Sequence, residues 1–315
     1  MGLENVTSKR VCIVDSSYSF FLYVLLFDKE IENTTFIVSS GIPDKVVNNI
    51  PNKIVIPAFG KSIFSTLFRL IYVLHFKFFR LKKIRPNKKS QVYGQDHLFY
   101  SFPFMRDGIS LIEDGMANYH HPKKSFSSKL RSLLSGGDEW GYSDKVEKIY
   151  LTGMYPIPEK LASKIELIDI KKIWQEKSLN QQKKITDLFS FTLEHSSSEK
   201  DVVILTQPFS EDGAITEIEK IEIYKNIAKN YEDSNIVIKP HPREITQYEV
   251  YFKCKVLNNH YPFQLFLLNQ NPSKIVSCFS SFPSKLEGVS VEMYGTGMSE
   301  KLKSFYGDIK GNVCG

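Results

Sequence analysis

The chain has 315 residues, of which 42% are hydrophobic and 24% are charged, and its formal net charge is +6. This composition is ordinary for a soluble globular protein with a real core. The length exceeds that of a single average domain, so we expect two domains of about 150 residues.

The cysteines and the N-terminus exclude several classes of protein. The four cysteines are scattered, with no C-x-x-C pair and no short metal-binding spacing. We therefore expect a reducing compartment, and neither a disulfide framework nor a zinc site. The N-terminus is polar, and the apolar run at residues 20–27 is too short to span a bilayer. We expect no cleavable signal peptide and no spanning helix.

Strand-like and helix-like segments alternate along the first half of the chain. A strand-like run is followed by an apolar helical stretch that ends near residue 31. The runs of strand length and character lie at 9–16, 34–40, 52–59, 97–102, 109–115 and 146–153. Strands that are separated by helical segments predict parallel, Rossmann-like layering.

A strongly basic segment interrupts this half. Between Lys45 and Gln95 there are eleven Lys or Arg residues and no Asp or Glu. Within it, residues 67–89 carry apolar side chains at helical spacing, interrupted by basic ones. One interpretation is a helix that packs on a sheet and has a solvated basic end. The other is a basic, aromatic-rich surface that contacts anionic membrane lipid. No recognisable nucleic-acid module accompanies the charge, so we expect no nucleic-acid partner.

The second half repeats the alternating pattern. The polar segment at 173–200 reads as a helix that leads into a loop. We expect the domain boundary within this segment or shortly before it, and divide the chain into domains at 1–172 and 173–315. Beyond it, strand candidates lie at 201–209, 234–242, 254–259 and 274–281, with an amphipathic helix at 215–231. There is no G-x-G-x-x-G motif and no Walker loop. We therefore predict an α/β enzyme made of two Rossmann-like domains with a cleft between them.

Four polar groups fall at the predicted strand ends, and ligands in open α/β sheets bind beyond the carboxyl ends of the strands. They are Glu113-Asp114-Gly115, Thr206 to Asp212, Lys239 to Pro242 and Phe279 to Ser281. Each alone has an ordinary explanation, because Asp and Gly are turn residues and serines cap helices. Their coincidence at successive strand ends indicates a binding or catalytic site.

These residues also carry a resemblance to a known family. The pieces LIEDGMANY, LTQPFSEDG, VIKPHPRE, YPFQLFLL and VSCFSS occur in this order between about residues 11 and 290. The set resembles the bacterial sialyltransferases of glycosyltransferase family 52, which decorate lipooligosaccharides and capsules. The resemblance implies a GT-B-like fold, with two Rossmann-like domains that have parallel sheets and face a central cleft. The N-terminal domain would lie on the acceptor side, and the C-terminal domain would bind the nucleotide donor.

The implied reaction moves sialic acid from CMP-sialic acid to a terminal galactose, with inversion and with an α2,3 linkage. His241 would then lie against the donor phosphate and stabilise or protonate the departing CMP. It stands between Pro240 and Pro242, whose fixed φ angles keep the backbone rigid. A rigid donor is favourable here because it need not reorganise when charge develops on the leaving group.

The resemblance also assigns the other donor-binding residues. Ser280 and Ser281 would add hydroxyl and amide donors to the phosphate. The backbones of Gln207 and Pro242 would contact the cytosine. Gln264 stands where related enzymes often carry a glutamate that grips the ribose hydroxyls, so this contact would lack charge.

The base that deprotonates the acceptor hydroxyl is left with two locations, since a carboxylate within hydrogen-bond reach is required. One is Asp114, with Glu113 and Gly115 beside it on the acceptor side. The other is Asp212, or Glu211, in the loop after the first strand of the second domain. Some relatives use the first location and family 52 members the second. We therefore expect Asp212 as base, with Asp114 lining the acceptor side or ordering its turn.

No cofactor and no metal are expected, because the chain has no Asp-x-Asp motif and a single donor phosphate leaves little charge for a cation to neutralise. We expect a cytoplasmic enzyme, held peripherally at the inner face of the plasma membrane through residues 67–89, and a homodimer by analogy with relatives. Two alternatives stay open. One is a GT-B glycosyltransferase of surface-polysaccharide synthesis with another donor, such as CMP-Kdo. The other is a non-catalytic membrane-surface protein.

Overall fold

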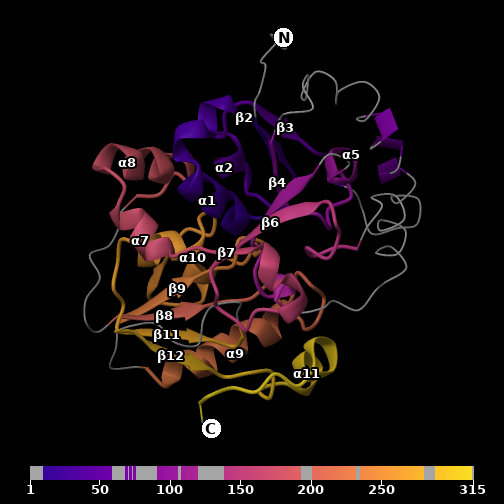
Figure 1. The fold of residues 1–315 in the computed structure, drawn as a ribbon. Helices are drawn as coiled ribbons and strands as arrows, with labels where there is room; N and C mark the ends of the chain where they lie inside the picture. The colour runs from indigo at the N-terminus through magenta and orange to yellow at the C-terminus, as the bar shows by residue number, and fades with distance from the viewer. Residues whose placement is uncertain are drawn as a thin grey trace. The chain divides into compact units, whose positions relative to one another are not determined.

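The computed structural model describes residues 10–58, 68–69, 71–72, 74–75, 91–105, 108–119, 138–192, 201–231, 235–279 and 288–313. These residues belong to two compact units, Met1–Ser190 and Phe191–Gly315 (Figure 1). Each unit is a parallel α/β structure, which confirms the predicted fold class.

The described part of the first unit contains a seven-stranded parallel sheet in the order β3-β2-β1-β4-β5-β6-β7. The central strands include unbroken buried apolar runs, Val11–Val14 and Phe36–Val38, as is usual for parallel strands that are covered on both faces. The strands are β1 (Arg10–Val14), β2 (Thr34–Val38), β3 (Lys53–Val55), β4 (Gln91–Gly94), β5 (Ile109–Ile112), β6 (Val146–Leu151) and β7 (Ile165–Leu167). The named α-helices of this unit are α1 (Ser17–Leu26), α2 (Asp44–Val47), α5 (Phe102–Met105), α7 (Ile170–Gln175) and α8 (Leu179–Leu188).

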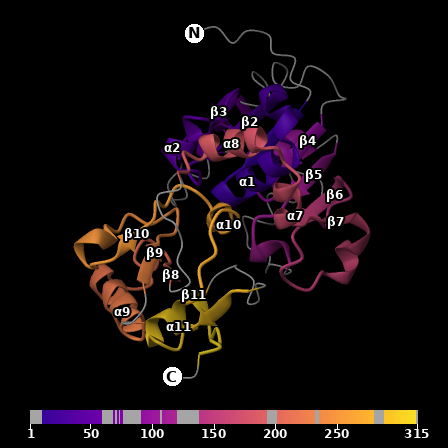
Figure 2. The same ribbon diagram turned by 90° about the vertical axis from the view of Figure 1, so that its left-hand side faces the viewer.

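Helix α1 is the central helix of this unit. Ser16 caps it, since the Ser16 side chain accepts a hydrogen bond from the Ser19 amide. Its aromatic and aliphatic side chains from Phe20 to Leu25 are fully buried. Figures 1 and 2 show α8 beside α1, and Phe189, just after α8, packs on Phe20 with a centroid distance of 5.3 Å.

The described part of the second unit contains a five-stranded parallel sheet in the order β10-β9-β8-β11-β12. Its strands are β8 (Asp201–Leu205), β9 (Asn235–Lys239), β10 (Lys255–Val256), β11 (Lys274–Ser277) and β12 (Ser290–Met293). Its named α-helices are α9 (Glu217–Lys229), α10 (Phe263–Leu267) and α11 (Glu300–Tyr306). Helix α9 begins with a capping box, in which Thr216 and Glu219 each bond the backbone amide of the other.

Both sheets share one topology. In each, the first strand of the unit lies between the second and the fourth, which is the 3-2-1-4-5 order of Rossmann-like sheets. The strand order reverses between β1 and β4 in the first unit, and between β8 and β11 in the second. Ligands in this architecture bind outside the carboxyl ends of the strands at such switch points.

Two predicted details differ from the structure. Residues 97–102 are not a strand, because β4 lies earlier and ends at Gly94. Gly94 has φ +132°, and a side chain there would meet the Ile13 carbonyl oxygen at 1.9 Å, so the chain leaves the sheet at this point. The boundary between the units follows Ser190, inside the polar segment at 173–200 but later than the division drawn at residue 172. Helices α7 and α8 belong to the first unit, where Lys177 and Gln181 bond Asp28 at 2.6 and 2.7 Å.

Several predictions fall largely outside the described residues. Ser280 and Ser281 lie outside them, as does most of the basic segment at 67–89. The described parts of that segment are helical, and Ile71 and Leu74 are exposed there. Among the described helices, none combines the length and the apolar character that a membrane span requires.

Candidate active site

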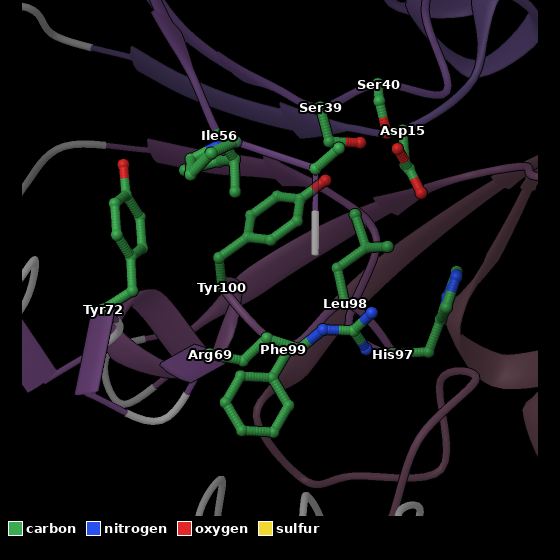
Figure 3. Close-up of a pocket in the computed structure, with 12 residues that line it drawn as sticks. Asp15, Ser39, Ser40, Ile56, Arg69, Tyr72, His97, Leu98, Phe99 and Tyr100 are labelled. Atoms are coloured by element: carbon green, nitrogen blue, oxygen red, sulfur yellow. The ribbon is translucent and has the colours of Figure 1, made fainter. Parts of the chain in front are cut away.

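A cavity of about 270 Å³ opens at the carboxyl ends of β1 to β4. Its lining has polar groups on one side and aromatic rings on the other (Figure 3). The lining residues are Asp15, Ser39, Ser40, Ile56, Pro57, Ala58, Arg69, Tyr72, His97, Leu98, Phe99 and Tyr100. The cavity therefore presents groups that bond hydroxyls next to surfaces that pack on C–H groups.

Asp15 follows β1 directly and is held by its neighbours on both sides. Its amide donates to Gln95 Oε1 at 3.1 Å, and its Oδ1 accepts from the Gly41 amide at 3.3 Å. A side chain at Gly41 would meet the Asp15 carbonyl oxygen at 1.9 Å, so this close approach requires glycine. Burial, and then the charge of Asp114, raise the pKa of Asp15 to about 6.

Asp114, after β5, is fixed by the serines that begin α1. Its Oδ1 accepts from the Ser16 hydroxyl at 2.8 Å, and the Ser19 hydroxyl lies 3.0 Å from the same oxygen. Its amide donates to Asn118 Oδ1 at 2.6 Å. Burial raises the pKa of Asp114, although the hydroxyl groups act in the opposite direction.

His97 links the cavity to Asp114. Its Nε2 lies 3.6 Å from Asp114 Oδ2, and its ring stacks on Trp140 with a centroid distance of 3.9 Å. Trp140 is positioned in turn by Asp96, whose Oδ1 accepts from the Trp140 amide at 2.9 Å. The imidazole is thus held between an indole face and a carboxylate.

Glu113 and Gly115 shape the turn rather than the cavity. Glu113 is fully buried and accepts hydrogen bonds from Tyr18, Tyr119 and Thr152 at 2.5 to 3.1 Å. Gly115 has φ +91°, a conformation that few other residues adopt. Both residues therefore fix the direction of Asp114.

In the second unit, His241 follows β9 in a closed turn. The His241 amide donates to Glu244 Oε2 at 2.7 Å, and the Glu244 amide donates to the His241 carbonyl oxygen at 3.0 Å. The Arg243 amide donates to His241 Nδ1 at 3.1 Å. A ring nitrogen that accepts carries no proton, so the neutral imidazole carries its hydrogen on Nε2.

The pKa of His241 strengthens this assignment. Burial lowers it to about 4, and the charges of Arg243 and Lys239 act in the same direction. The imidazole is therefore neutral at pH 7 and presents one N–H donor.

The turn rests on a buried carboxylate. Glu244 is 3% exposed and also accepts from the hydroxyl groups of Thr206 and Tyr248, the latter at 2.8 Å. The ammonium of Lys220, itself fully buried, lies 3.8 Å away. Glu244 thus joins the His241 backbone to Thr206 and Tyr248 through hydrogen bonds, and this network explains the fixed position of His241.

Asp212 and Glu211, the predicted bases of the second unit, are both paired with cations. The Arg243 guanidinium donates to both carboxylate oxygens of Asp212, at 2.6 and 3.2 Å, and Tyr306 donates at 3.0 Å. Burial alone would raise the pKa of Asp212, but these donors outweigh it and lower the pKa. Glu211 accepts from the Ile245 amide at 3.0 Å and lies 2.9 Å from Lys220 Nζ, and these donors outweigh burial and lower its pKa.

The remaining predicted donor contacts lie around the same edge. The Gln207 amide, just after β8, donates to the Tyr224 hydroxyl at 2.7 Å. Pro242 belongs to the His241 turn, and Gln264 lies in α10, where it is half-buried. Phe279, which precedes the predicted serines, packs on Phe209 with a centroid distance of 5.5 Å.

Sequence reasoning singled out Asp114, Asp212 and His241, and each of them follows a strand. It did not single out Asp15 and His97, which line the cavity. The signal for Asp15 was its place directly after the first predicted strand, within VDSS. His97 was hidden because residues 97–102 were read as a strand. Within the described residues, no cluster of three or more His, Cys, Asp or Glu side chains could hold a metal ion.

The sequence profile of glycosyltransferase family 52 matches residues 22–298. An uncharacterized protein of Haemophilus influenzae is 33% identical over 311 residues, which cover 96% of this chain and 99% of that protein.

Two solved structures show a similar fold at low identity. One is an α/β-galactoside α-2,3-sialyltransferase from the luminous marine bacterium Photobacterium phosphoreum, with a TM-score of 0.55 and 13% identity over 90% of this chain and 88% of that one. The other is a UDP-GlcNAc 2-epimerase from Neisseria meningitidis, with a TM-score of 0.50 and 13% identity over 94% and 90%. The likeness to a transferase and to an epimerase establishes the fold alone.

Proposed function

The chain belongs to glycosyltransferase family 52, and from that premise we propose that it is an inverting, metal-independent sialyltransferase. It transfers sialic acid from CMP-sialic acid to a terminal galactose of a bacterial surface glycan, a capsule or a lipooligosaccharide. The product linkage is α2,3.

The His241 turn is the observation that carries this proposal. A neutral imidazole with its N–H on Nε2 suits a leaving phosphate, because it donates a hydrogen bond as negative charge develops. Its backbone amide and its Nδ1 are already bonded within the turn. The ring therefore need not reorganise during the reaction, and Nε2 can keep its proton while it donates a hydrogen bond to the departing CMP.

The donor nucleotide lies along the carboxyl edge of the second sheet in this proposal. The backbones of Gln207 and Pro242 contact the cytosine, and Gln264 contacts the ribose. Ser280 and Ser281 complete the phosphate site. One phosphate carries less charge than a diphosphate, so His241 and these hydroxyl groups can neutralise it without a cation.

The acceptor occupies the cavity at the carboxyl edge of the first sheet. Its size suits a sugar ring, whose hydroxyl groups match Asp15 and His97 and whose C–H face matches Phe99 and Tyr100. Asp114 orients His97 from behind, at 3.6 Å. In this proposal the turn from Glu113 to Gly115 acts on the acceptor side indirectly, because Asp114 orients His97.

Asp212 is the proposed base, and its pairing with Arg243 sets a condition on that role. A carboxylate with a lowered pKa is a weak base, so the guanidinium must leave before Asp212 accepts a proton. Arg243 is exposed, and exposed ion pairs are worth about 1 kcal/mol or less. A bound phosphate can therefore compete for Arg243 and free the carboxylate.

The test is CMP release from CMP-sialic acid, with and without lactose. Wild-type protein should release CMP in a lactose-dependent manner, and His241→Ala should lower the rate about 100-fold or more. His241→Gln places an amide N–H near the position of Nε2, so it should recover part of the rate that His241→Ala loses. No CMP release together with no CMP binding by the wild type would overturn the donor assignment, and CMP-Kdo would then be the next donor to test.

The remaining partners are still predictions from the sequence. They are contact of residues 67–89 with anionic lipid, a cytoplasmic location at the inner membrane face, and a homodimer. Vesicle co-sedimentation with and without anionic lipid tests the first directly.

A further inference from the structure

Lys239, the last residue of β9, is a buried cation that the proposed chemistry leaves without a role. Lys239 is only 3% exposed. Its ammonium donates to the Pro240 carbonyl oxygen at 3.1 Å and lies 4.8 Å from the centroid of the Tyr261 ring. An ammonium can donate three hydrogen bonds, and the described residues supply one acceptor.

The other buried lysine of this unit shows what a structural ion pair looks like. Lys220 is fully buried and lies within 3.1 Å of carboxylate oxygens of both Glu211 and Glu217. Among the described residues, no ion pair joins Lys239 to a carboxylate, and Glu244 acts on it only through its charge at longer range. Burial accordingly lowers the pKa of Lys239 to about 7.

The position of Lys239 connects the two segments that would hold the donor. It precedes the His241 turn directly, and its charge reaches that imidazole, because it contributes to the lowered pKa of His241. Through Tyr261 it also contacts the YPFQ segment, which carries Gln264. A cation on an aromatic face is stabilised by the ring quadrupole, but it keeps its positive field.

We propose that Lys239 determines the selectivity of this site for nucleotides over nucleosides, as a buried cation that attracts the phosphate held at the His241 turn. The inference rests on the proposed function, since it assigns a residue to the same donor site. Lys239 acts through its field and by holding the turn against the YPFQ segment.

The charges around the turn are consistent with this role. Glu211 and Glu217 are compensated by Lys220, and Asp212 is compensated by Arg243. Glu244 accepts three hydrogen bonds from its neighbours, described above. Lys239 is therefore the cation of this group whose charge is least compensated, and a phosphate beside His241 would provide the missing anion.

The experiment compares the binding of CMP and cytidine by calorimetry. These ligands differ in the phosphate alone, so the ratio of their dissociation constants isolates its contribution. Lys239→Met should weaken CMP binding about tenfold and change cytidine binding less than twofold, since the variant removes charge at nearly constant volume. Lys239→Arg, which keeps the charge, should retain the wild-type ratio.

Lys274→Met is the matched control. Lys274 also lies over a tyrosine ring, at 5.2 Å from the Tyr231 centroid, but at the amino end of β11 in the same sheet. This variant should leave both affinities unchanged. If Lys239→Met weakens CMP and cytidine equally, or changes neither, the proposal is wrong and Lys239 is structural.

The same measurement separates this proposal from the proposed function. If the wild type prefers another nucleoside monophosphate to CMP, the donor assignment fails, and the Lys239 ratio is then measured with that nucleotide and its nucleoside. If the wild type binds no nucleoside monophosphate, both proposals are overturned.

Discussion

The carboxyl edges of the two sheets have the same strand order but treat charge in opposite ways. In the first unit, Asp15 and Asp114 are partly or largely buried, and burial raises the pKa of each. In the second unit, Asp212 and Glu211 are paired with Arg243 and Lys220, which outweigh burial and lower their pKa values. One edge collects carboxylates that tend to hold protons, and the other collects carboxylates that release them.

Topology therefore sets the place of a site, and side-chain partners set its chemistry. An edge of weakly acidic carboxyl groups suits neutral hydroxylated ligands, which need hydrogen-bond acceptors. An edge with a neutral imidazole and buried cations suits an anion. The two edges therefore match the two substrates of the proposed transfer, and the contrast can be tested residue by residue.

The largest effect is expected from exchanging the proposed base. Asp212→Asn should lower kcat about 100-fold or more, because a positioned general base contributes about 10²- to 10⁴-fold. Asp114→Asn should act mainly on the KM for lactose, since Asp114 orients His97 and the α1 serines. Initial rates at varied lactose separate the two effects. If Asp114→Asn loses more kcat than Asp212→Asn, the base lies in the first unit.

The second effect concerns stability and the buried cation. The unfolded chain holds the Lys239 proton up to pH about 10.4, whereas the folded chain releases it near pH 7. A depressed pKa in the folded state means that stability is lost as pH falls towards 7. The free energy of unfolding of Lys239→Met, relative to that of the wild type, should therefore be higher at pH 7 than at pH 9.5. The expected increase is on the order of 2 kcal/mol.

Urea denaturation of both proteins at the two pH values measures this change, with Lys274→Met as control. If the stability difference between the two proteins is the same at both pH values, folding does not lower the pKa of Lys239. The combination of higher stability and weaker CMP binding would indicate a functional residue, since active sites commonly retain groups that cost stability.

The third effect has the opposite sign because the group is an acid. The pKa of Asp15 is about 6 in the folded chain and about 3.9 when unfolded. A raised pKa adds stability that is lost as pH rises through 6, so the ionised carboxylate destabilises the folded chain at pH 8. The free energy of unfolding of Asp15→Asn, relative to that of the wild type, should be higher at pH 8 than at pH 4 by about 1 to 2 kcal/mol. Denaturation of both proteins at the two pH values measures it. An unchanged difference between these pH values would show that Asp15 is well solvated.

The sequence predicted the strand ends well, because apolar β-branched runs and the residues that stop them are local signals. It placed Asp114, Asp212 and His241 correctly after strands β5, β8 and β9. Gly94 was a local signal too, yet the apolar run after it was read as the strand. His97 was lost as a candidate for this reason.

The electrostatics of the site could not be predicted, because they depend on contacts between distant residues. Asp114 is bonded by Ser16, 98 positions away, and Asp212 is bonded by Arg243, 31 positions away. Periodicity carries no information on such pairs. The place of the domain boundary within the polar segment at 173–200 depends on such contacts too, since α7 and α8 are polar by sequence but attach to the first unit through Asp28.

The smallest effect tests the pair that the sequence concealed. Arg243→Gln removes the cation that lowers the pKa of Asp212, so this pKa should rise, because a nearby opposite charge favours the ionised form. The acid limb of the kcat/KM profile should then move to higher pH by the same amount. Lys301→Gln removes an exposed ion pair of the same unit, the one with Glu219, and should leave the profile in place. If Arg243→Gln also leaves the acid limb in place, the limb belongs to another group and Asp212 does not act as the base. If the limb moves, one measurement identifies both the base and the cation that lowers its pKa, and donor binding can be tested as the event that separates them.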